Sequence, residues 1–453
     1  MSKILVAGAG HGGLSAAFNL ASQGQDVTVY EKNKEEELGH DWQDFFDFKC
    51  LSYAGFPMPE EGLVNRYSMN MIFSFDPYIN LQQKPLEDAF ELYLYRSEIY
   101  AHLIKSCREA GVKFCFESEV GDVIMLGNRI CGIMVGGEPV YGDLVIDATG
   151  MYSALQPKIP QYLSFDNHYS GCEIIHVYRA YFNRVKDAPD PGRPVYDVVF
   201  PSDGNSGLEW VKLNEDTVDI LIGRLGNTSE EIVAGRLAEL RKNYPFIGEE
   251  IVHGGIFCDI PIRQPVPVLV ANGFAALGDS ACMTMPMMGS GIANAVKAGK
   301  MLADAVAADR NGEFSAEKLW AFQKRYYKEI GFSCCNVALF KVFINSMKTE
   351  ELKFFITQEL LSADDINFTT EGSGFFSKLI AGGLDPRELL TKAKKLRTNP
   401  ALIGKLTSFV SNMIKMQGLK ALMPQKYTEA AAASWAQKYN SFFSAISNEG
   451  SID

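Results

Sequence analysis

The stretch Lys3-Ile4-Leu5-Val6-Ala7-Gly8-Ala9-Gly10-His11-Gly12-Gly13, close to the start of the chain, decides the fold. Its first part is apolar, as in a buried parallel strand, and the segment from Leu14 to Ser22 has apolar residues at helical spacing. Between them lies a G-x-G-x-x-G sequence. Asp26 to Tyr30 is typical of a second strand, and Glu31 stands at its end. The stretch therefore predicts a strand–helix–strand unit that binds a dinucleotide.

Each part of this unit has a physical role. Gly8 permits the tight turn, Gly10 allows the backbone to approach a pyrophosphate, and Gly13 allows helix and strand to pack closely. The phosphates then face the positive end of a helix. A carboxylate at Glu31 accepts hydrogen bonds from a ribose diol. A glycine-rich turn in another α/β protein is the alternative, and the unit alone leaves FAD and NAD(P) both open.

Composition restricts the class of protein. The 453 residues are enough for two or three domains, and a net charge of −12 argues against nucleic acid as the partner. The same charge weakens attraction to anionic lipid, although apolar peripheral contact with a membrane stays open. No apolar run is long enough to span a membrane, and no signal peptide precedes the first strand, so we expect a cytoplasmic protein. The nine cysteines and six histidines are scattered, which predicts reduced thiols and no metal site.

The rest of the chain divides into three kinds of pattern. Residues 86–166 predict a strand, a helix, a β-meander and a buried strand at 144–146, and residues 258–312 predict a further buried strand followed by a long helix. Residues 167–257 are mostly strand-like, with one helix at 229–244. Residues 313–453 are amphipathic and helical in pieces.

Three further segments carry features of a dinucleotide site: Arg96 before a helix, Asp147-Ala148-Thr149-Gly150, and Gly278-Asp279. In order and spacing they resemble the FAD-binding module of the superfamily that contains aromatic-ring hydroxylases, flavin halogenases and geranylgeranyl reductases. The run Pro286 to Gly299, with its G-S-G-I sequence, is most similar to the geranylgeranyl-reductase-like branch. The aromatic substrate signature of those reductases is matched poorly, at Phe200-Pro201.

The resemblance implies a fold, a cofactor and its contacts. It implies an α/β fold with a discontinuous Rossmann-like FAD-binding domain of the glutathione-reductase type (1–44, 86–166 and 258–312). An antiparallel β-sheet substrate domain (45–85 and 167–257) and a helical C-terminal region (313–453) complete it. The residues that would contact FAD are Gly8, Gly10, His11, Gly12, Gly13, Glu31, Lys32, Arg96, Val120, Thr149, Gly150, Gly278, Asp279, Pro286, Gly289, Ser290, Gly291 and Ile292.

The resemblance favours a reductase or dehydrogenase that acts on C=C or C–C bonds by flavin hydride transfer. The alternatives are an NAD(P)H- and oxygen-dependent flavin monooxygenase and a non-catalytic flavin-binding partner protein. Because no second glycine-rich domain is present, NAD(P)H would bind transiently, or an electron-carrier protein would supply electrons. Four methionines at 283, 285, 287 and 288 suggest a hydrophobic small-molecule substrate, although a packed core explains them equally.

The candidate proton donors are Cys282, Cys50 and Tyr53. Reduction of a C=C bond needs a proton from an acid or from water besides the hydride. For each cysteine the ordinary alternative is a small buried hydrophobe. The sequence does not decide between these roles, and it leaves the oligomeric state open.

Overall fold

A computed structural model of the chain describes residues 1–65, 71–76, 79–82, 90–160, 169, 173–200, 207–361, 378 and 386–449. Its first layer is a mostly parallel six-stranded sheet, in which only β18 runs antiparallel to its neighbour. In spatial order the strands are β18 (Val270–Ala271), β19 (Phe274–Ala276), β12 (Leu144–Asp147), β1 (Lys3–Ala7), β2 (Asp26–Tyr30) and β8 (Lys113–Cys115).

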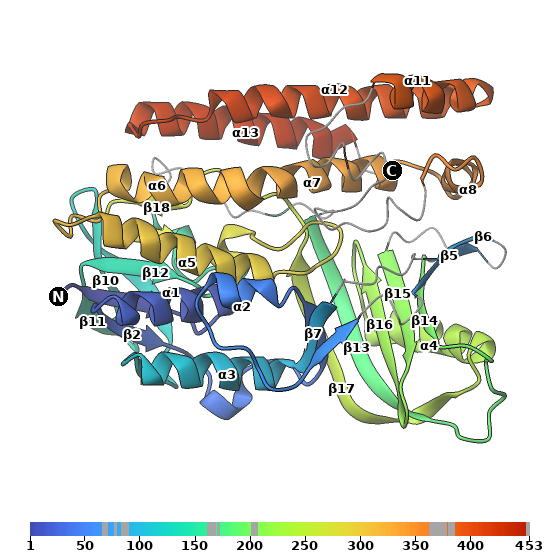
Figure 1. Cartoon of the computed structure of the whole chain (residues 1–453), viewed down its shortest axis with the longest axis horizontal. Coiled ribbons are helices and arrows are strands. Elements are labelled where there is room, and N and C mark those ends of the chain that lie inside the picture. Colours follow the sequence, from blue (N-terminus) through green and yellow to red (C-terminus); the bar gives the residue numbers. More distant parts are fainter. Residues whose placement is uncertain are drawn as a thin grey trace.

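Three helices pack with this sheet: α1 (His11–Ser22), α3 (Arg96–Glu109) and α5 (Ile292–Ala308) (Figure 1). Small residues bring α1 and α5 together, since a Cβ atom on Gly299 would lie 2.6 Å from the Gly12 carbonyl oxygen. A separate antiparallel meander, β9 (Val120–Leu126), β10 (Arg129–Val135) and β11 (Glu138–Tyr141), lies against β12. The predicted Rossmann-like architecture is therefore confirmed.

A seven-stranded sheet forms the second part of the molecule, and α4 (Glu230–Asn243) covers one of its apolar clusters. Its order is β17 (Ile247–Pro261), β13 (Ile174–Arg184), β16 (Thr217–Arg224), β15 (Gly207–Leu213), β14 (Tyr196–Val199), β5 (Ile72–Asp76) and β6 (Ile79–Gln82). Only β14 and β5 pair in parallel. The segment 45–85 contributes to two different sheets. β5 and β6 belong to the seven-stranded sheet, whereas β4 (Leu63–Asn65) pairs in a separate three-stranded sheet with β7 (Phe90–Tyr95), which also pairs with β3 (Gln43–Phe46).

The sequence did not predict the 15-residue strand β17. Gly254 and Gly255 lie within it at φ +77° and +74°, where the register with β13 shifts at Arg179 and Ala180. Such glycines mark a β-bulge, which local patterns do not separate from a turn. Pro201, the second residue of the poorly matched aromatic signature, lies outside the described residues.

The C-terminal helices form two layers over α5 (Figure 1). The inner layer contains α6 (Ala316–Tyr326) and α7 (Phe332–Asn345), which a π-helical turn joins, and beyond them lies α8 (Thr349–Thr357). The outer layer contains α11 (Pro386–Lys395), α12 (Pro400–Leu422) and α13 (Glu429–Glu449). The sequence did not predict α11 or α13 as separate helices. α13 nevertheless buries Trp435, Tyr439, Phe443 and Ile446, which recur at helical spacing, so the sequence did carry a signal for this helix.

No single helix among the described residues is both long and apolar enough to cross a membrane. One pair bent by 111°, Ala316–Asn345 with Thr349–Thr357, satisfies the criteria jointly by length and composition. Its apolar side chains, including Trp320, Phe322 and Phe340, are buried in the protein core. This burial is typical of a core helix.

Candidate functional site

The glycine loop after β1 is crowded by backbone on its inner side. Gly8 has φ +87°, and a Cβ atom there would lie 2.4 Å from the Ala148 carbonyl oxygen. A Cβ atom on Gly13 would lie 2.8 Å from both the Gly8 oxygen and the Ala148 Cβ atom. Gly10 precedes α1, and no side chain caps the helix there. The loop therefore presents free N–H groups at a positive helix end, as a phosphate site requires.

Two predicted residues border this loop. The buried Glu31 carboxylate accepts hydrogen bonds from the Ala9 backbone N–H at 2.8 Å and the Asn33 N–H at 3.0 Å. It keeps lone pairs free for a diol. The Nε2 atom of His11 is buried and has no hydrogen-bond partner among the described residues. Burial and the nearby Arg96 lower the pKa of His11 to about 3, so its ring is neutral at pH 7.

The turn after β12 is organised by a buried carboxylate. Asp147 accepts hydrogen bonds from the Thr149 N–H and hydroxyl and from the Ser153 hydroxyl, at 3.0, 2.7 and 2.6 Å. Gly150 has φ +92°, and no heavy atom lies within 4 Å of the position that a Cβ atom would take there. The turn thus holds an accessible stretch of backbone beside the glycine loop, and burial raises the pKa of Asp147.

A second carboxylate, half-buried, lies where β19 leads toward α5. Asp279 accepts a hydrogen bond from the Thr284 hydroxyl at 2.8 Å, and burial raises its pKa. A Cβ atom on Gly291 would lie 3.1 Å from the Thr284 oxygen and 3.5 Å from the Asp279 oxygen. Glycine at this position therefore leaves the carboxylate accessible at the start of α5.

Arg96 occupies the start of α3, beside the Asp44 carboxylate. Its Nε atom donates to Asp44 at 2.6 Å, and its guanidinium lies 5.4 Å from the centre of the Trp42 ring. Tyr100, one helical turn later, packs its ring 4.6 Å from that of His11. The sequence did not single out Tyr100, although its spacing of four residues from Arg96 places both on one helix face.

The remaining predicted cofactor contacts differ in exposure. Gly278 and Gly289 have positive φ, at +67° and +66°. Pro286, Ile292 and Val120 are buried, and Lys32 and Ser290 are exposed. Their contact with a cofactor stays a prediction.

Cys282, the first of the predicted proton donors, has a polar partner from a distant segment. It has φ +53° and is fully buried, and its sulfur lies 3.3 Å from the Tyr169 hydroxyl. Burial raises the pKa of the Cys282 thiol to about 11 and also raises that of Tyr169. Both groups are therefore protonated at pH 7 and able to donate. No local pattern identifies Tyr169, because its partner is 113 residues away.

Cys50 and Tyr53 both lie on the short helix α2 (Lys49–Tyr53), which packs on α5. Cys50 is completely buried, and burial raises the pKa of its thiol to about 12. The Tyr53 hydroxyl donates to Glu329 at 2.9 Å and accepts from Arg325 at 2.8 Å. These bonds connect α2 to the helical region. The catalytic role of either residue stays a prediction.

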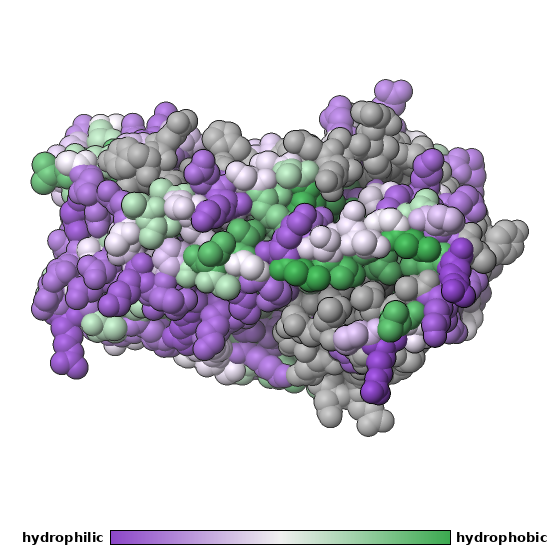
Figure 2. All heavy atoms as spheres, turned by 90° about the horizontal axis from the view of Figure 1, so that it is seen from above, coloured by the Kyte–Doolittle hydropathy of each residue, from purple (hydrophilic) through white to green (hydrophobic). Residues whose placement is uncertain are grey.

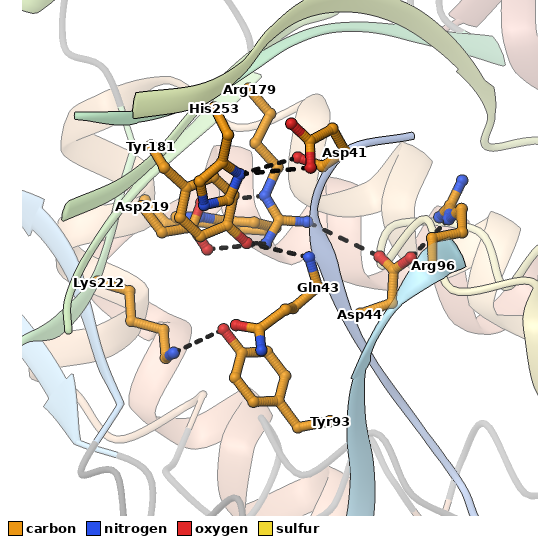
Figure 3. Close-up of polar contacts among 11 residues, drawn as sticks. Asp41, Gln43, Asp44, Tyr93, Arg96, Arg179, Tyr181, Lys212, Asp219 and His253 are labelled. Atoms are coloured by element: carbon orange, nitrogen blue, oxygen red, sulfur yellow. Dashed lines mark hydrogen bonds and ion pairs between the residues drawn. The ribbon is translucent and has the colours of Figure 1, made fainter. Parts of the chain in front are cut away.

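A polar network joins β3 and α3 to the seven-stranded sheet, and the sequence did not predict it (Figure 3). Arg179 on β13 is buried and donates to both carboxylate oxygens of Asp219 on β16, at 3.0 and 2.7 Å. It also lies 3.7 Å from the Asp44 carboxylate, which itself pairs with Arg96. We call Asp44, Arg96, Arg179 and Asp219 the interdomain network. It links β3 and α3 to the seven-stranded sheet through charges of alternating sign.

Aromatic rings enclose the centre of this network. The Arg179 guanidinium lies 4.8 Å from the Trp210 ring centre and 5.4 Å from those of Trp42 and Tyr181. The Tyr181 ring stacks on His253 at 4.0 Å, and its hydroxyl accepts the Gln43 N–H at 3.1 Å. Rings of this kind exclude water and stabilise a cation through their faces.

Lys212 on β15 lies beside the same cluster. Its ammonium donates to the Tyr93 hydroxyl at 2.7 Å and to Asn214 at 2.8 Å (Figure 3). Among the described residues no carboxylate lies within ion-pair distance of it. Burial lowers the pKa of Lys212 to about 8.

These residues fit FAD, which the resemblance implies. The crowded glycines form a cradle without side chains, α1 offers uncapped N–H groups, and His11 Nε2 is a buried polar atom that no described residue partners. Glu31 and Asp279 provide carboxylates at two separate positions. Together these groups suit a molecule with a pyrophosphate and several hydroxyls.

Comparison with known proteins finds the same kind of resemblance. Residues 6–83 match the model of the NAD(P)-binding Rossmann-like domain. A digeranylgeranylglycerophospholipid reductase of Sulfolobus acidocaldarius is 21% identical over 96% of this chain and 96% of its own length. Among solved structures, a geranylgeranyl bacteriochlorophyll reductase-like protein of Thermoplasma acidophilum has a TM-score of 0.67 at 17% identity, covering 90% of this chain and 99% of its own.

A probable FAD-dependent monooxygenase from Pseudomonas aeruginosa shares the fold with a TM-score of 0.57 at 18% identity, over 78% of this chain and 98% of its own.

The similarity to the two reductase-type proteins confirms the predicted resemblance to FAD-dependent oxidoreductases of the geranylgeranyl-reductase-like type.

Proposed function

From its similarity to flavoproteins of the geranylgeranyl-reductase-like type, we propose that this chain is an FAD-dependent oxidoreductase that reduces C=C bonds of a hydrophobic, lipid-like molecule. One observation carries the proposal: the similarity to the Sulfolobus acidocaldarius reductase extends over 96% of each chain. A match of this extent includes the seven-stranded sheet and the helical region, where the substrate of such an enzyme would bind.

Within the proposal, the chain positions the cofactor and a proton. When bound, FAD supplies hydride transfer. The N–H groups at the start of α1 would bind its phosphates, Glu31 would accept hydrogen bonds from its ribose, and Asp279 would bind it near the start of α5. The Cys282 thiol supplies the proton, because it is buried, protonated at pH 7 and hydrogen-bonded to Tyr169. Cys50 is the second candidate for this role.

The substrate and the electron source have different support. A hydrophobic substrate is supported by the names of the relatives and by the methionine-rich loop, in which Met283 is buried and Met288 is 42% exposed. Electrons from NAD(P)H or from an electron-carrier protein, and a cytoplasmic location, stay predictions.

The second candidate is the NAD(P)H- and oxygen-dependent monooxygenase, which the shared fold of the Pseudomonas aeruginosa protein favours. The third is a flavin-binding protein without catalysis. Each predicts a different oxidant for the reduced protein, so a kinetic measurement separates the three.

The test uses the full chain loaded with FAD and reduced without oxygen. It is mixed in separate experiments with a lipid that carries geranylgeranyl chains, with the saturated lipid and with dissolved oxygen, and flavin absorbance is followed. We expect fast reoxidation by the unsaturated lipid alone, slowed about 100-fold or more in Cys282→Ala. Fast reoxidation by oxygen with no response to the lipid supports the monooxygenase. A flavin that responds to neither supports the binding protein.

A further inference from the structure

The outer helical layer carries a charge opposite to that of the whole chain. Residues 386–426, which form α11, α12 and the turn after them, contain nine lysines and arginines and one acidic residue, Glu388. Their net charge is +8, whereas the whole chain has −12. The net charge of the whole chain therefore averages over two regions of opposite sign.

The outward face of α12 is unusually apolar for an exposed helix. Ile414 is 60% exposed and Leu422 56%, while Leu402, Phe409 and Met413 on the other side are buried. Between the exposed apolar residues lie uncharged ones and two exposed lysines, Lys415 and Lys420. All three charged residues of α12 are lysines. The solvent-facing side of a surface helix normally carries charged and polar residues, and on this helix none of them is a carboxylate.

The neighbouring helix extends this surface. Leu390 on α11 is 62% exposed, and Lys394 and Lys395 follow it on the exposed side. We define the basic apolar face as Leu390, Lys394, Ile403, Ile414, Lys415 and Leu422. Figure 2 looks down on the outer helical layer and shows apolar side chains gathered along its middle, with hydrophilic ones around them.

We propose that the basic apolar face docks on an anionic lipid surface, with α12 lying in the plane of the headgroups. Exposed apolar side chains enter the headgroup region, and lysines attract anionic lipids within about a Debye length. α12 is not apolar enough to cross a membrane, which favours lying on the surface.

Charge also decides between lipid and a second copy of the chain. In a twofold-symmetric pair the same face meets itself, so the exposed lysines of one copy would face those of the other and repel them. The remainder of the chain has a strongly negative net charge, which disfavours approach to an anionic surface through its acidic parts. Docking does not depend on the proposed reaction, because it is measured without turnover.

The test is vesicle co-sedimentation of the FAD-loaded full chain. Vesicles of pure phosphatidylcholine are compared with vesicles that contain phosphatidylglycerol, at low and at high salt. We expect about ten-fold stronger partition to the anionic vesicles, and a loss of that preference at high salt. Both Lys394→Glu/Lys415→Glu and Ile403→Ser/Ile414→Ser should lower binding to anionic vesicles about ten-fold.

The matched control is Lys186→Glu/Lys242→Glu, which makes the same change in net charge at side chains that are 77% and 68% exposed on the other domain. It should bind within about two-fold of the unchanged protein. Equal partition to neutral and anionic vesicles, or unchanged binding of the Lys394→Glu/Lys415→Glu variant, overturns the proposal. So does a concentration-dependent dimer that Ile403→Ser/Ile414→Ser abolishes while vesicle binding stays absent.

Discussion

The Rossmann-like domain and the seven-stranded sheet each contain polar groups inside the protein, but they accommodate them in opposite ways. The first removes side chains: a Cβ atom on Gly8 or Gly13 would strike backbone, and N–H groups remain to bind a ligand. The second buries charged side chains and pairs them across strands, as Arg179 and Asp219 do. The glycines of the loop are close together in the sequence, whereas the paired charges come from different strands. We therefore expect the two regions to respond differently to substitution.

The largest expected effect is in the sheet. Asp219→Ala leaves Arg179 buried without its bidentate partner, and removing one member of a buried pair costs about 3–5 kcal/mol. Urea unfolding of the FAD-loaded chain measures this loss. The control Lys186→Ala, at a pair whose side chains are 77% and 71% exposed, should change the unfolding free energy by less than about 1 kcal/mol. Equal effects of the two variants would remove the proposed role of burial.

The next effect is in the glycine loop. Gly8→Ala places a methyl group 2.4 Å from the Ala148 oxygen at φ +87°, so we expect a loss of about 2–4 kcal/mol and of bound FAD. Gly24→Ala is the matched control, because it has φ +84° and nothing within 4 Å. It should cost only about 1 kcal/mol, the penalty of the backbone conformation. Similar losses in both variants would mean that crowding has no role.

The sequence predicted the local device well, for physical reasons. Strand, glycines, helix and Glu31 lie within 31 residues, so spacing alone identifies the unit. It could not predict the interdomain network, because Arg179 and Asp219 are 40 residues apart and meet only through the register of β13 and β16. The available signal was that Arg179 and Asp219 are each a charged residue within an otherwise apolar strand. The bulged strand β17 was missed because its two glycines also fit a turn, whereas α13 was missed although its large apolar residues recur at helical spacing.

A third prediction concerns pH and again belongs to the sheet. The pKa of Lys212 is lowered to about 8 in the folded chain from an ordinary value of 10.5, so the unfolded state binds more protons between these values. Stability should therefore rise with pH in this window, by about 1–3 kcal/mol relative to Lys212→Met. The measurement is the difference in unfolding free energy between the two proteins at pH 7.5 and at about pH 10. A difference that does not change with pH would show that the ammonium is not desolvated.

The smallest effect is at the cofactor. Glu31→Gln keeps one oxygen for the Ala9 N–H but removes the acceptor of the Asn33 N–H and the charge that a ribose diol prefers. FAD affinity should fall about ten-fold, and the apoprotein should lose about 1 kcal/mol of stability. Fluorescence titration of the apoprotein with FAD measures it. An affinity unchanged by Glu31→Gln would place the ribose elsewhere.

The same contrast explains what the sequence revealed about the reaction. Cys282 follows the Gly278-Asp279 motif and was found by its position, whereas its partner Tyr169 comes from a distant segment. His11 was recognised as a loop residue, but its contact with Tyr100 depends on how α1 and α3 pack. The glycine loop and its neighbours could thus be located from the sequence, although their contacts with a cofactor stay predictions, and the side chains that distant segments bring together could not.

The central claim, reduction of C=C bonds, is tested most directly by the mass of the product of a single turnover. The reduced, FAD-loaded chain is mixed with a geranylgeranyl lipid, and a parallel sample receives isotopically labelled oxygen. We expect a product heavier by two hydrogen atoms for each double bond reduced, with no labelled oxygen in either sample. A product that carries labelled oxygen, or a lipid of unchanged mass from a protein whose flavin is reduced, would contradict the claim.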